Sequence, residues 1–372
     1  MNGQWIGDYS GTNNGTLIAN IDEFSKYYEG LIYLDEVDSN LPSTSVLIRT
    51  PNKNSQQQFT SLKIAPINPF TGTADAWENV KKHYPESVVI PTTAEINTSI
   101  AGDELSISWV TNIGTNGVSI LKRSQAKNPS ELIATEHDWG SFKNYLGQIE
   151  SRKFIFRGQS KQWRLQTSFH RTGRANLIRF INEDIQMLHK HLSARTKHLF
   201  NLDIPNENGA FYNLVQHHGY PTPLLDWSYS PYVAAFFAFR DITNKKSELA
   251  NKTDKVRIVM FDKEAWKADF NQLAYLVSFR PHVSINEFMA IENERMIPQQ
   301  AVTTVTNIDD IEAYIQAKEI LNTKKYLYAF DLPVNDRPIV MNDLSRMGIT
   351  AGSLFPGLDG ACEELKERNF VF

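Results

Sequence analysis

Short apolar stretches separated by turn residues fill the first 125 residues. The stretches are rich in β-branched and aromatic residues, and Gly, Asn, Pro or Ser bounds each of them, which is typical of strands. In the clearest pair, Leu105, Ile107 and Trp109 alternate with polar residues, and a turn over 112–117 leads into a second such stretch. This alternation predicts a half-buried β-hairpin. Further strands are expected at residues 16–21, 29–34, 45–49 and 59–64.

Such strands, with almost no helical period between them, predict an all-β domain over residues 1–125, either an antiparallel sandwich or a closed barrel. One helix is expected at residues 74–83. Gly3 and Trp5 on the first strand, with Arg123 at the end of the last, resemble the pattern of small calycin-type barrels. Small barrels are often filled by their own side chains, so we favour Trp5 as a plug of the barrel floor, with ligand binding as the alternative.

The apolar spacing becomes helical after a polar linker expected at residues 126–139. Residues 176–200 carry Ile and Leu at three- and four-residue spacings, which predicts an amphipathic helix. Residues 255–261 and 325–330 are expected as buried strands, and residues 309–321 as a helix. Residues 140–372 are therefore expected to form a separate α+β domain.

Composition narrows the class of protein. The 38 basic and 42 acidic residues leave no net positive charge for non-specific nucleic-acid binding. Cys362 is the only cysteine, which excludes an intrachain disulfide and a Cys-rich zinc site, and no metal is expected. The first residues lack the basic and apolar regions of a leader, and the longest apolar run, near 233–239, is far below the ~20 residues that span a bilayer. A cytoplasmic protein without a membrane partner is expected.

Candidate chemistry begins in the second domain at Arg157, which follows an apolar strand and precedes Gly158 and Gln159. An arginine there either caps a strand end or presents its fork to a carboxylate or phosphate. A second polar segment covers residues 216–231, where Ser230 is expected as a helix N-cap. The other polar and aromatic side chains of this segment need partners, either structural or functional. They are His217, His218, Asp226, Trp227 and Ser228.

Separate motifs in this half resemble the FRG domain family, named for its Phe-Arg-Gly tripeptide. The first is Phe156-Arg157-Gly158, and the second is the block over 216–231. The others are Arg295-x-x-x-Gln299-Gln300, residues 344–349 and residues 353–360. The resemblance covers about residues 140–372. Pro223 departs from the pattern, which has a basic residue there, so no phosphate contact is expected from it.

The order of residues is also similar to that of the arginine-class mono-ADP-ribosyltransferases, with an arginine, a Ser-x-Ser motif and a Glu-x-Glu motif. Arg157, then Ser228 and Ser230, then Glu292 and Glu294 stand in this order. The resemblance implies that Arg157 binds a phosphate of the co-substrate NAD and that the two serines shape the NAD cleft. Glu294 would be the catalytic carboxylate that stabilises the ribosyl cation as nicotinamide leaves.

The remaining residues of this cleft are expected to bind NAD or its acceptor, with Trp227 or Tyr229 stacking on nicotinamide and Glu292 or Gln299 contacting the acceptor. They are Gly158, Gln159, His217, His218, Asp226, Trp227 and Gln299.

The function expected from these patterns is an NAD-consuming effector of the toxin or antiphage-defence type. Its β-rich domain would sense a trigger ligand or dock a target, and its FRG domain would modify a macromolecular acceptor, either protein or nucleic acid. One alternative is a non-catalytic nucleotide-binding module. Another is a hydrolase or nuclease using His217, His218 and Asp226, although the sequence has neither a nucleophile elbow nor a two-metal carboxylate cluster.

Overall fold

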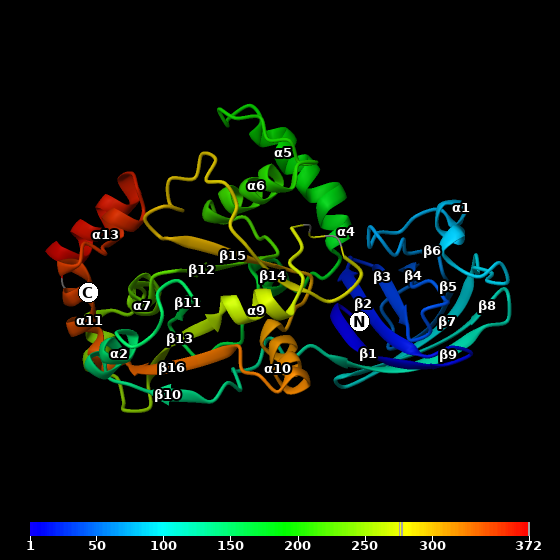
Figure 1. The fold of residues 1–372 in the computed structure, drawn as a ribbon, viewed down its shortest axis with the longest axis horizontal. Helices are drawn as coiled ribbons and strands as arrows, with labels where there is room; N and C mark the ends of the chain where they lie inside the picture. The colour runs from blue at the N-terminus through cyan, green and yellow to red at the C-terminus, as the bar shows by residue number, and fades with distance from the viewer. Residues whose placement is uncertain (275, 277, 371–372) are drawn as a thin grey trace.

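The computed structural model describes residues 1–274, 276 and 278–370 and contains two domains that lie side by side (Figure 1). The first is all-β, and the second contains a sheet and most of the helices. The N-terminus lies near the contact between the domains, and the C-terminus lies at the far end of the second (Figure 1). Within the described part of the chain, no helix is both long enough and apolar enough to cross a bilayer.

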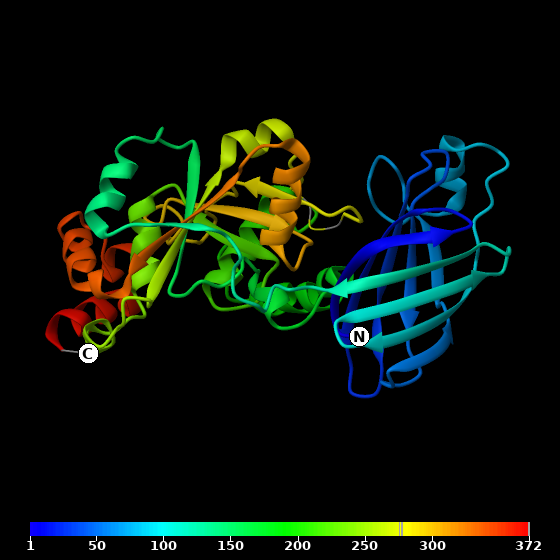
Figure 2. The same ribbon diagram turned by 90° about the horizontal axis from the view of Figure 1, so that it is seen from below.

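The first domain is a single antiparallel sheet that curls on itself (Figure 2). Its strands are β1 (Gly3–Gly11), β2 (Gly15–Glu23), β3 (Tyr28–Glu36), β4 (Thr44–Arg49), β5 (Gln56–Thr60), β6 (Lys63–Pro66), β7 (Ala94–Ala101), β8 (Glu104–Thr111) and β9 (Asn116–Arg123). Helix α1 (Trp77–Val80) and the 3-10 turn η1 (Lys81–His83) separate β6 from β7, as expected. The all-β prediction is confirmed as a curled sheet and not as a two-sheet sandwich.

The two edge strands of this sheet are consecutive in sequence and are joined by a very short connection. The strand order is β5-β7-β8-β9-β1-β2-β3-β4-β6, which makes β5 and β6 the edges, yet only Ser61 and Leu62 separate them in sequence. Ser61 donates its backbone N–H to Ala94 beside one edge, and Leu62 donates to Leu47 beside the other, both at 2.9 Å. The single strand expected at residues 59–64 is therefore divided between both edges and joins them.

Apolar side chains fill the interior of the curled sheet. Trp5 is fully buried, and its indole Nε1 donates to the Met1 carbonyl at 2.7 Å. The Arg123 guanidinium lies 4.4 Å from the centre of a Trp5 ring. The neighbouring Gln4 bonds to the second domain through the Asn307 carbonyl at 2.7 Å. Trp5 thus closes the end of the curl that faces the second domain, as its interpretation as a floor plug requires.

The second domain is built on a mixed sheet. Its strands are β10 (Ala134–Glu136), β11 (Phe154–Gln159), β12 (Leu224–Ser228), β13 (Lys255–Asp262), β14 (Val283–Asn286), β15 (Ala301–Thr306) and β16 (Leu327–Pro333). They follow the order β10-β16-β13-β11-β12-β15-β14, with β10 and β16 parallel and the other pairs antiparallel. Its helical segments are α2 (Trp139–Leu146), α3 (Ser168–Arg171), α4 (Leu177–Arg179), η2 (Phe180–Ile185), α5 (Gln186–Leu192), α6 (Pro205–His217), α7 (Pro231–Phe239), α8 (Asn244–Glu248), α9 (Lys263–Asp269), α10 (Ile311–Asn322), η3 (Val334–Asp336), α11 (Arg337–Arg346), α12 (Ala351–Leu354) and α13 (Leu358–Asn369). The α+β prediction is confirmed.

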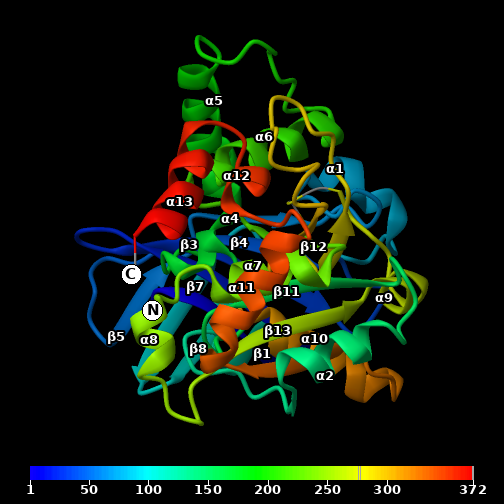
Figure 3. The same cartoon turned by 90° about the vertical axis from the view of Figure 1, so that its left-hand side faces the viewer.

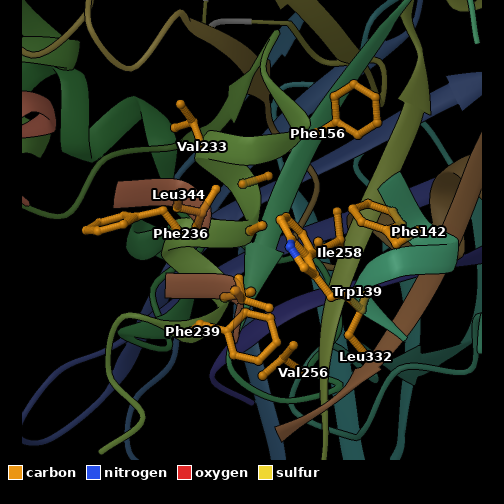
Figure 4. Close-up of a cluster of buried hydrophobic side chains, with 14 of the residues drawn as sticks. Trp139, Phe142, Phe156, Val233, Phe236, Phe239, Val256, Ile258, Leu332 and Leu344 are labelled. Atoms are coloured by element: carbon orange, nitrogen blue, oxygen red, sulfur yellow. The ribbon is translucent and has the colours of Figure 1, made fainter. Parts of the chain in front are cut away.

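Each face of this sheet carries an apolar core, because successive residues of a strand point to opposite faces. On β13, Val256 and Ile258 pack with α7 and Trp139 in one core (Figure 4). Val259 and Phe261 of the same strand pack with residues of α9 and α10 in the other. The two faces explain why β13 is apolar throughout.

Helix α7 lies unusually close to β11. Ser230 caps it as expected, since its Oγ accepts the N–H of Val233 at 3.2 Å. The helix is almost wholly apolar and is buried in the core shown in Figure 4. A Cβ atom at Gly158 would lie 1.8 Å from the Ala234 carbonyl oxygen, well inside the van der Waals limit. Gly158 therefore serves the packing of α7 on β11.

Two expected boundaries differ from the structure. The helix expected at 176–200 is the run α4-η2-α5, which ends at Leu192 and contains a π-helical stretch. The linker expected at 126–139 is partly built into the second domain. Strand β10 pairs with β16, Leu132 is buried, and Ser130 donates its N–H to the Gln162 carbonyl at 2.9 Å.

A buried carboxylate joins the two domains. Asp22 on β2 is 1% exposed and accepts the backbone N–H groups of Ala175 (2.8 Å) and Asn176 (3.1 Å). It also pairs with the guanidiniums of Arg174 (3.0 Å) and Arg179 (3.3 Å). Four donors from the second domain thus meet one acidic group of the first.

We expect the stability of the second domain to fall on mild acidification. Burial lowers the pKa of His282 from 6.5 to about 4, and burial lowers that of His170 as well. The unfolded chain takes up these protons below its own pKa and the folded chain does not, so stability falls between about pH 6.5 and about pH 4.

For His282 the loss is about 3 kcal/mol, measured as the free energy of unfolding in denaturant. His282→Gln should flatten this pH dependence, whereas the exposed His191→Gln should leave it unchanged. A free energy of unfolding that is equal at both ends of this range in the unaltered protein would contradict the assignment.

Candidate functional site

A pocket of about 360 Å³ opens beside the end of β11 and is also lined by β12, α7 and the chain before β15. Figure 3 looks onto this end of the domain, where α7 and β11 lie behind the C-terminal helices α11, α12 and α13. The pocket contains many of the residues expected from the sequence. They are Arg157, Gly158, Gln159, His217, Asp226, Trp227, Ser228 and Gln299. Strand pairing brings the two motifs together, because Phe156 on β11 is the partner of Ser228 on β12.

Arg157 is held in place without an ion pair. Its Nη1 donates to the backbone carbonyl of Asp226 at 2.7 Å. Burial lowers the pKa of Arg157 from 12.5 to about 10, while the Asp226 carboxylate opposes this shift and Arg171 adds to it. The guanidinium stays charged at neutral pH and is poorly hydrated, a state that favours an anionic ligand.

Two further arginines line the same pocket. Arg171 ends α3, and Arg295 precedes β15 and donates to the His217 carbonyl at 2.8 Å. Other arginines of this domain, among them Arg164, Arg240 and Arg257, are paired with carboxylates. Among the described residues, no such pair is found for Arg157, Arg171 or Arg295. Their convergence gives the pocket a positive wall.

The carboxylates of the pocket are those of Asp226 and Asp241. The Asp226 carboxylate raises the pKa of both Arg157 and Arg171, which opposes the lowering that burial causes. It therefore lies near the two guanidiniums without forming a salt bridge to either. A charged carboxylate beside this positive wall can stabilise a cation that forms in the pocket.

Two other polar groups are available in the pocket. His217 Nδ1 is 2.8 Å from Asn293 Oδ1, which fixes the orientation of the ring. Gln159 donates through Nε2 to the Trp163 carbonyl at 3.1 Å, while its buried Oε1 has no hydrogen-bond partner among the residues that the structure describes. A buried polar atom without a partner costs free energy, so Gln159 Oε1 is ready to accept a hydrogen bond from a ligand.

Several expected ligand residues are instead engaged in the structure. The Ser228 hydroxyl donates to the Gln299 carbonyl at 2.7 Å and accepts the Ser230 N–H at 2.9 Å. Ser230 caps α7 and does not line the pocket. Gln299 Nε2 donates to the Leu354 carbonyl at 3.0 Å. These groups shape the wall of the pocket.

The ring of Trp227 is 3% exposed and packs in the core on the other side of the sheet, where its Nε1 donates to Thr304 Oγ1 at 3.1 Å. Stacking of this ring on a ligand in the pocket is therefore excluded, which corrects the role expected from the sequence.

Glu294 and His218 lie elsewhere. Glu294 is exposed and is absent from the lining of the pocket, so it does not supply the carboxylate that the motif order assigned to it. Glu292 and His218 line a neighbouring hollow, where Glu292 accepts the His198 N–H. The loop between β14 and β15 is irregular, and in such a loop residue spacing does not determine which side chain turns inward.

Sequence reasoning missed Arg171, Asp241 and Asn293 as site residues and used Arg295 only as a motif position. The spacing of Arg295 and Gln299 in the motif was a sequence signal that could have identified Arg295 as a site residue. Arg171 is the last residue of the short helix α3, Asp241 lies just after α7, and neither carries a local pattern. Among the described residues, no group of three or more metal-ligating side chains could hold a metal ion.

Comparison with known families identifies part of the chain. Residues 152–247 match the family model of the FRG domain. This stretch is an FRG domain match, as the motifs at 156–158 and 216–231 predicted, and it includes Arg157, Arg171, Asp226 and Asp241. Arg295 and the expected motifs at 344–349 and 353–360 lie outside it. A search of curated proteins found no match.

Proposed function

We propose that the FRG pocket binds NAD and that the domain is an ADP-ribosyltransferase. The observation that supports this most is the convergence of Arg157, Arg171 and Arg295 around one pocket that also holds Asp226. None of the three is paired with a carboxylate of the described residues. The pocket volume of about 360 Å³ is also within the usual range for small-molecule sites, roughly 300–1,000 Å³.

In this proposal the arginines bind the pyrophosphate. A guanidinium fork matches two phosphate oxygens and keeps its charge when water is excluded. Arg157 is already oriented by the Asp226 carbonyl, and Arg295 by the His217 carbonyl, so little side-chain entropy is lost on binding. Gln159 Oε1 would accept a hydrogen bond from a ribose hydroxyl or from the nicotinamide amide.

Asp226 replaces Glu294 as the proposed catalytic carboxylate. The bond that breaks joins ribose C1′ to the nicotinamide nitrogen, and its electron pair leaves with neutral nicotinamide. The remaining ribosyl cation is stabilised by a nearby carboxylate until a nucleophile of the acceptor forms the new bond at C1′ and loses its proton. The proposal also includes a macromolecular acceptor, either protein or nucleic acid, and a role as a toxin or antiphage effector.

Product analysis tests this function. The protein would be incubated with NAD and the products separated by chromatography. Release of nicotinamide is expected, because the glycosidic bond is the one that breaks. Intact NAD together with measurable NAD binding would support a non-catalytic module instead.

A second candidate is hydrolysis of a phosphate ester or anhydride. The observation that favours it is His217, oriented by Asn293 in the same pocket as the arginines. A histidine held in this way can act as a general acid or base. Cleavage of NAD to AMP and nicotinamide mononucleotide, abolished in His217→Gln, would support this candidate and contradict the first.

The arginine wall predicts a specific loss of affinity. Arg157→Lys keeps the charge but removes the fork, and we expect NAD binding to weaken about tenfold or more, since a hydrogen bond to a charged group contributes about 1.5–3 kcal/mol. Calorimetric titration measures this change. Arg346→Lys, an exposed site on α11, is the matched control and should bind NAD as the unaltered protein does. Equal affinity in Arg157→Lys would contradict the assignment.

A further inference from the structure

The curled sheet of the first domain contains a cavity of about 110 Å³. Its walls are mainly aliphatic side chains that point inward from several strands. They include Leu17, Ile32, Leu34, Val46, Ile96 and Ile107. The cavity lies toward the β1–β2 hairpin, at Tyr9, Thr12 and Asn13. Trp5 fills the opposite end, next to the second domain.

The width of the sheet explains why space remains. The interior of a barrel widens as strands are added, and an interior of about eight strands is either filled by side chains or holds one small ligand. Within the described residues this sheet has nine strands. Its own side chains fill the Trp5 end but leave the other end open.

The cavity reaches the surface between two loops. Val89 and Ile113 both line it, yet they are 63% and 41% exposed. Apolar side chains that are partly exposed to water at the mouth of an apolar cavity become buried when a ligand covers them, which favours binding.

One end of the cavity is polar. Tyr9 is buried, with 5% of the residue exposed, and its hydroxyl makes no regular hydrogen bond to the described residues. The Glu36 carboxyl beside it has a buried oxygen, Oε2, that likewise makes none to the described residues. Burial raises the pKa of Glu36, which favours its neutral form, while interactions with Tyr9 and Asn13 oppose this. Tyr9 and Glu36 thus partner each other in part, and hydrogen-bonding capacity remains on both groups at this end of the cavity.

Two glycines make room for the aromatic rings at the polar end of the cavity. A Cβ atom at Gly117 would lie 2.3 Å from the Trp109 ring, and one at Gly15 would lie 2.7 Å from the Tyr9 ring. The missing side chains at Gly117 and Gly15 make room for the two rings. The rings contact each other edge to face, with centres 5.5 Å apart. These contacts restrict the positions of both rings, which lowers the entropy lost on binding.

We propose that this cavity binds a small uncharged molecule, about the size of a single aromatic ring, whose hydroxyl group hydrogen-bonds to Tyr9 and Glu36. An apolar protein cavity of ~150 Å³ binds benzene. The cavity here, at about 110 Å³, is smaller, so one ring is the upper limit of size, and part of the ligand would lie at the mouth beside Val89 and Ile113. The ligand class follows from the aliphatic walls and the unsatisfied polar end. The site is separate from the FRG pocket, and its test does not depend on NAD chemistry.

Calorimetry with phenol and toluene tests the site, because the two probes differ by one hydroxyl group. The full chain is expected to bind both and to bind phenol about fivefold more tightly, as one additional hydrogen bond allows. Tyr9→Phe should keep toluene binding and reduce the phenol preference. Tyr33→Phe, a tyrosine on β3 that does not line the cavity, is the matched control and should keep the preference.

Failure of both probes to bind at millimolar concentration, with the protein shown to be folded by circular dichroism, would overturn the site. An equal phenol preference in Tyr9→Phe and in the unaltered protein would overturn the role of Tyr9. Ala94→Leu, which adds side-chain atoms at the cavity wall, gives a second measurement and should weaken toluene binding at least tenfold.

Discussion

Gly158→Ala is expected to destabilise the FRG domain by at least about 3 kcal/mol, a large share of the roughly 5–15 kcal/mol that stabilises a typical folded protein. The new Cβ atom would lie 1.8 Å from the Ala234 carbonyl oxygen and 2.8 Å from the Ala238 nitrogen. Both are backbone atoms of α7, a helix buried in the core of Figure 4, so neither can move aside cheaply. The glycine that ends the Phe-Arg-Gly tripeptide is therefore required by packing.

Denaturant unfolding followed by circular dichroism measures this effect. Gly140→Ala is the matched control. Gly140 lies in helix α2, and the nearest atom to its new Cβ would be Asp138 Oδ1 at 3.4 Å. Alanine should be neutral there or stabilise by up to ~1 kcal/mol. An unfolding midpoint of Gly158→Ala equal to that of the unaltered protein would contradict the close contact between β11 and α7.

Asp22→Ala should weaken the coupling between the two domains by about 2–5 kcal/mol. Removal of this carboxylate leaves the buried backbone N–H groups of Ala175 and Asn176 without their acceptor. Arg174 and Arg179 lose one partner each but keep Asp184 and Glu183. We expect thermal unfolding to change from a single transition to two, because the domains would no longer stabilise each other.

Asp35→Asn provides the control for this prediction. Asp35 also pairs across the domain boundary, with Arg280 at 3.3 Å, but the arginine side chain is 68% exposed. Exposed pairs contribute about 0–1 kcal/mol, so this variant should unfold nearly as the unaltered protein does. Equal effects of Asp22→Ala and Asp35→Asn would show that the interface does not depend on the buried carboxylate.

Local patterns predicted most of the strands and helices but not all of their partners. The hairpin of β8 and β9 is confirmed, because the alternation of apolar and polar residues reflects one buried face of the sheet. The stretch at 59–64 was also extended as expected, yet alternation cannot reveal that its pairing changes from β7 to β4 after Ser61. The helix expected at 176–200 ends at Leu192, where the apolar spacing gives way to the polar run Ser-Ala-Arg-Thr-Lys at 193–197.

The candidate site shows the same limit. Arg157 and Asp226 were found because both lie on strands with clear motifs, and β11 and β12 are neighbours in the sheet. Arg171 was missed because it comes from a short helix that tertiary packing brings to the pocket. Glu294 was favoured by motif order alone, and the irregular loop before β15 turns it to solvent.

The most direct test of the proposed chemistry is nicotinamide release from NAD by the unaltered protein, Asp226→Asn and Glu294→Gln. Asp226→Asn keeps the backbone carbonyl that orients Arg157 and removes only the charge. We expect it to lose about 100-fold or more of the rate, as is usual when an electrostatic group of an active site is removed. Glu294→Gln should release nicotinamide at the normal rate. Normal release by Asp226→Asn, together with loss of release in Glu294→Gln, would contradict the account.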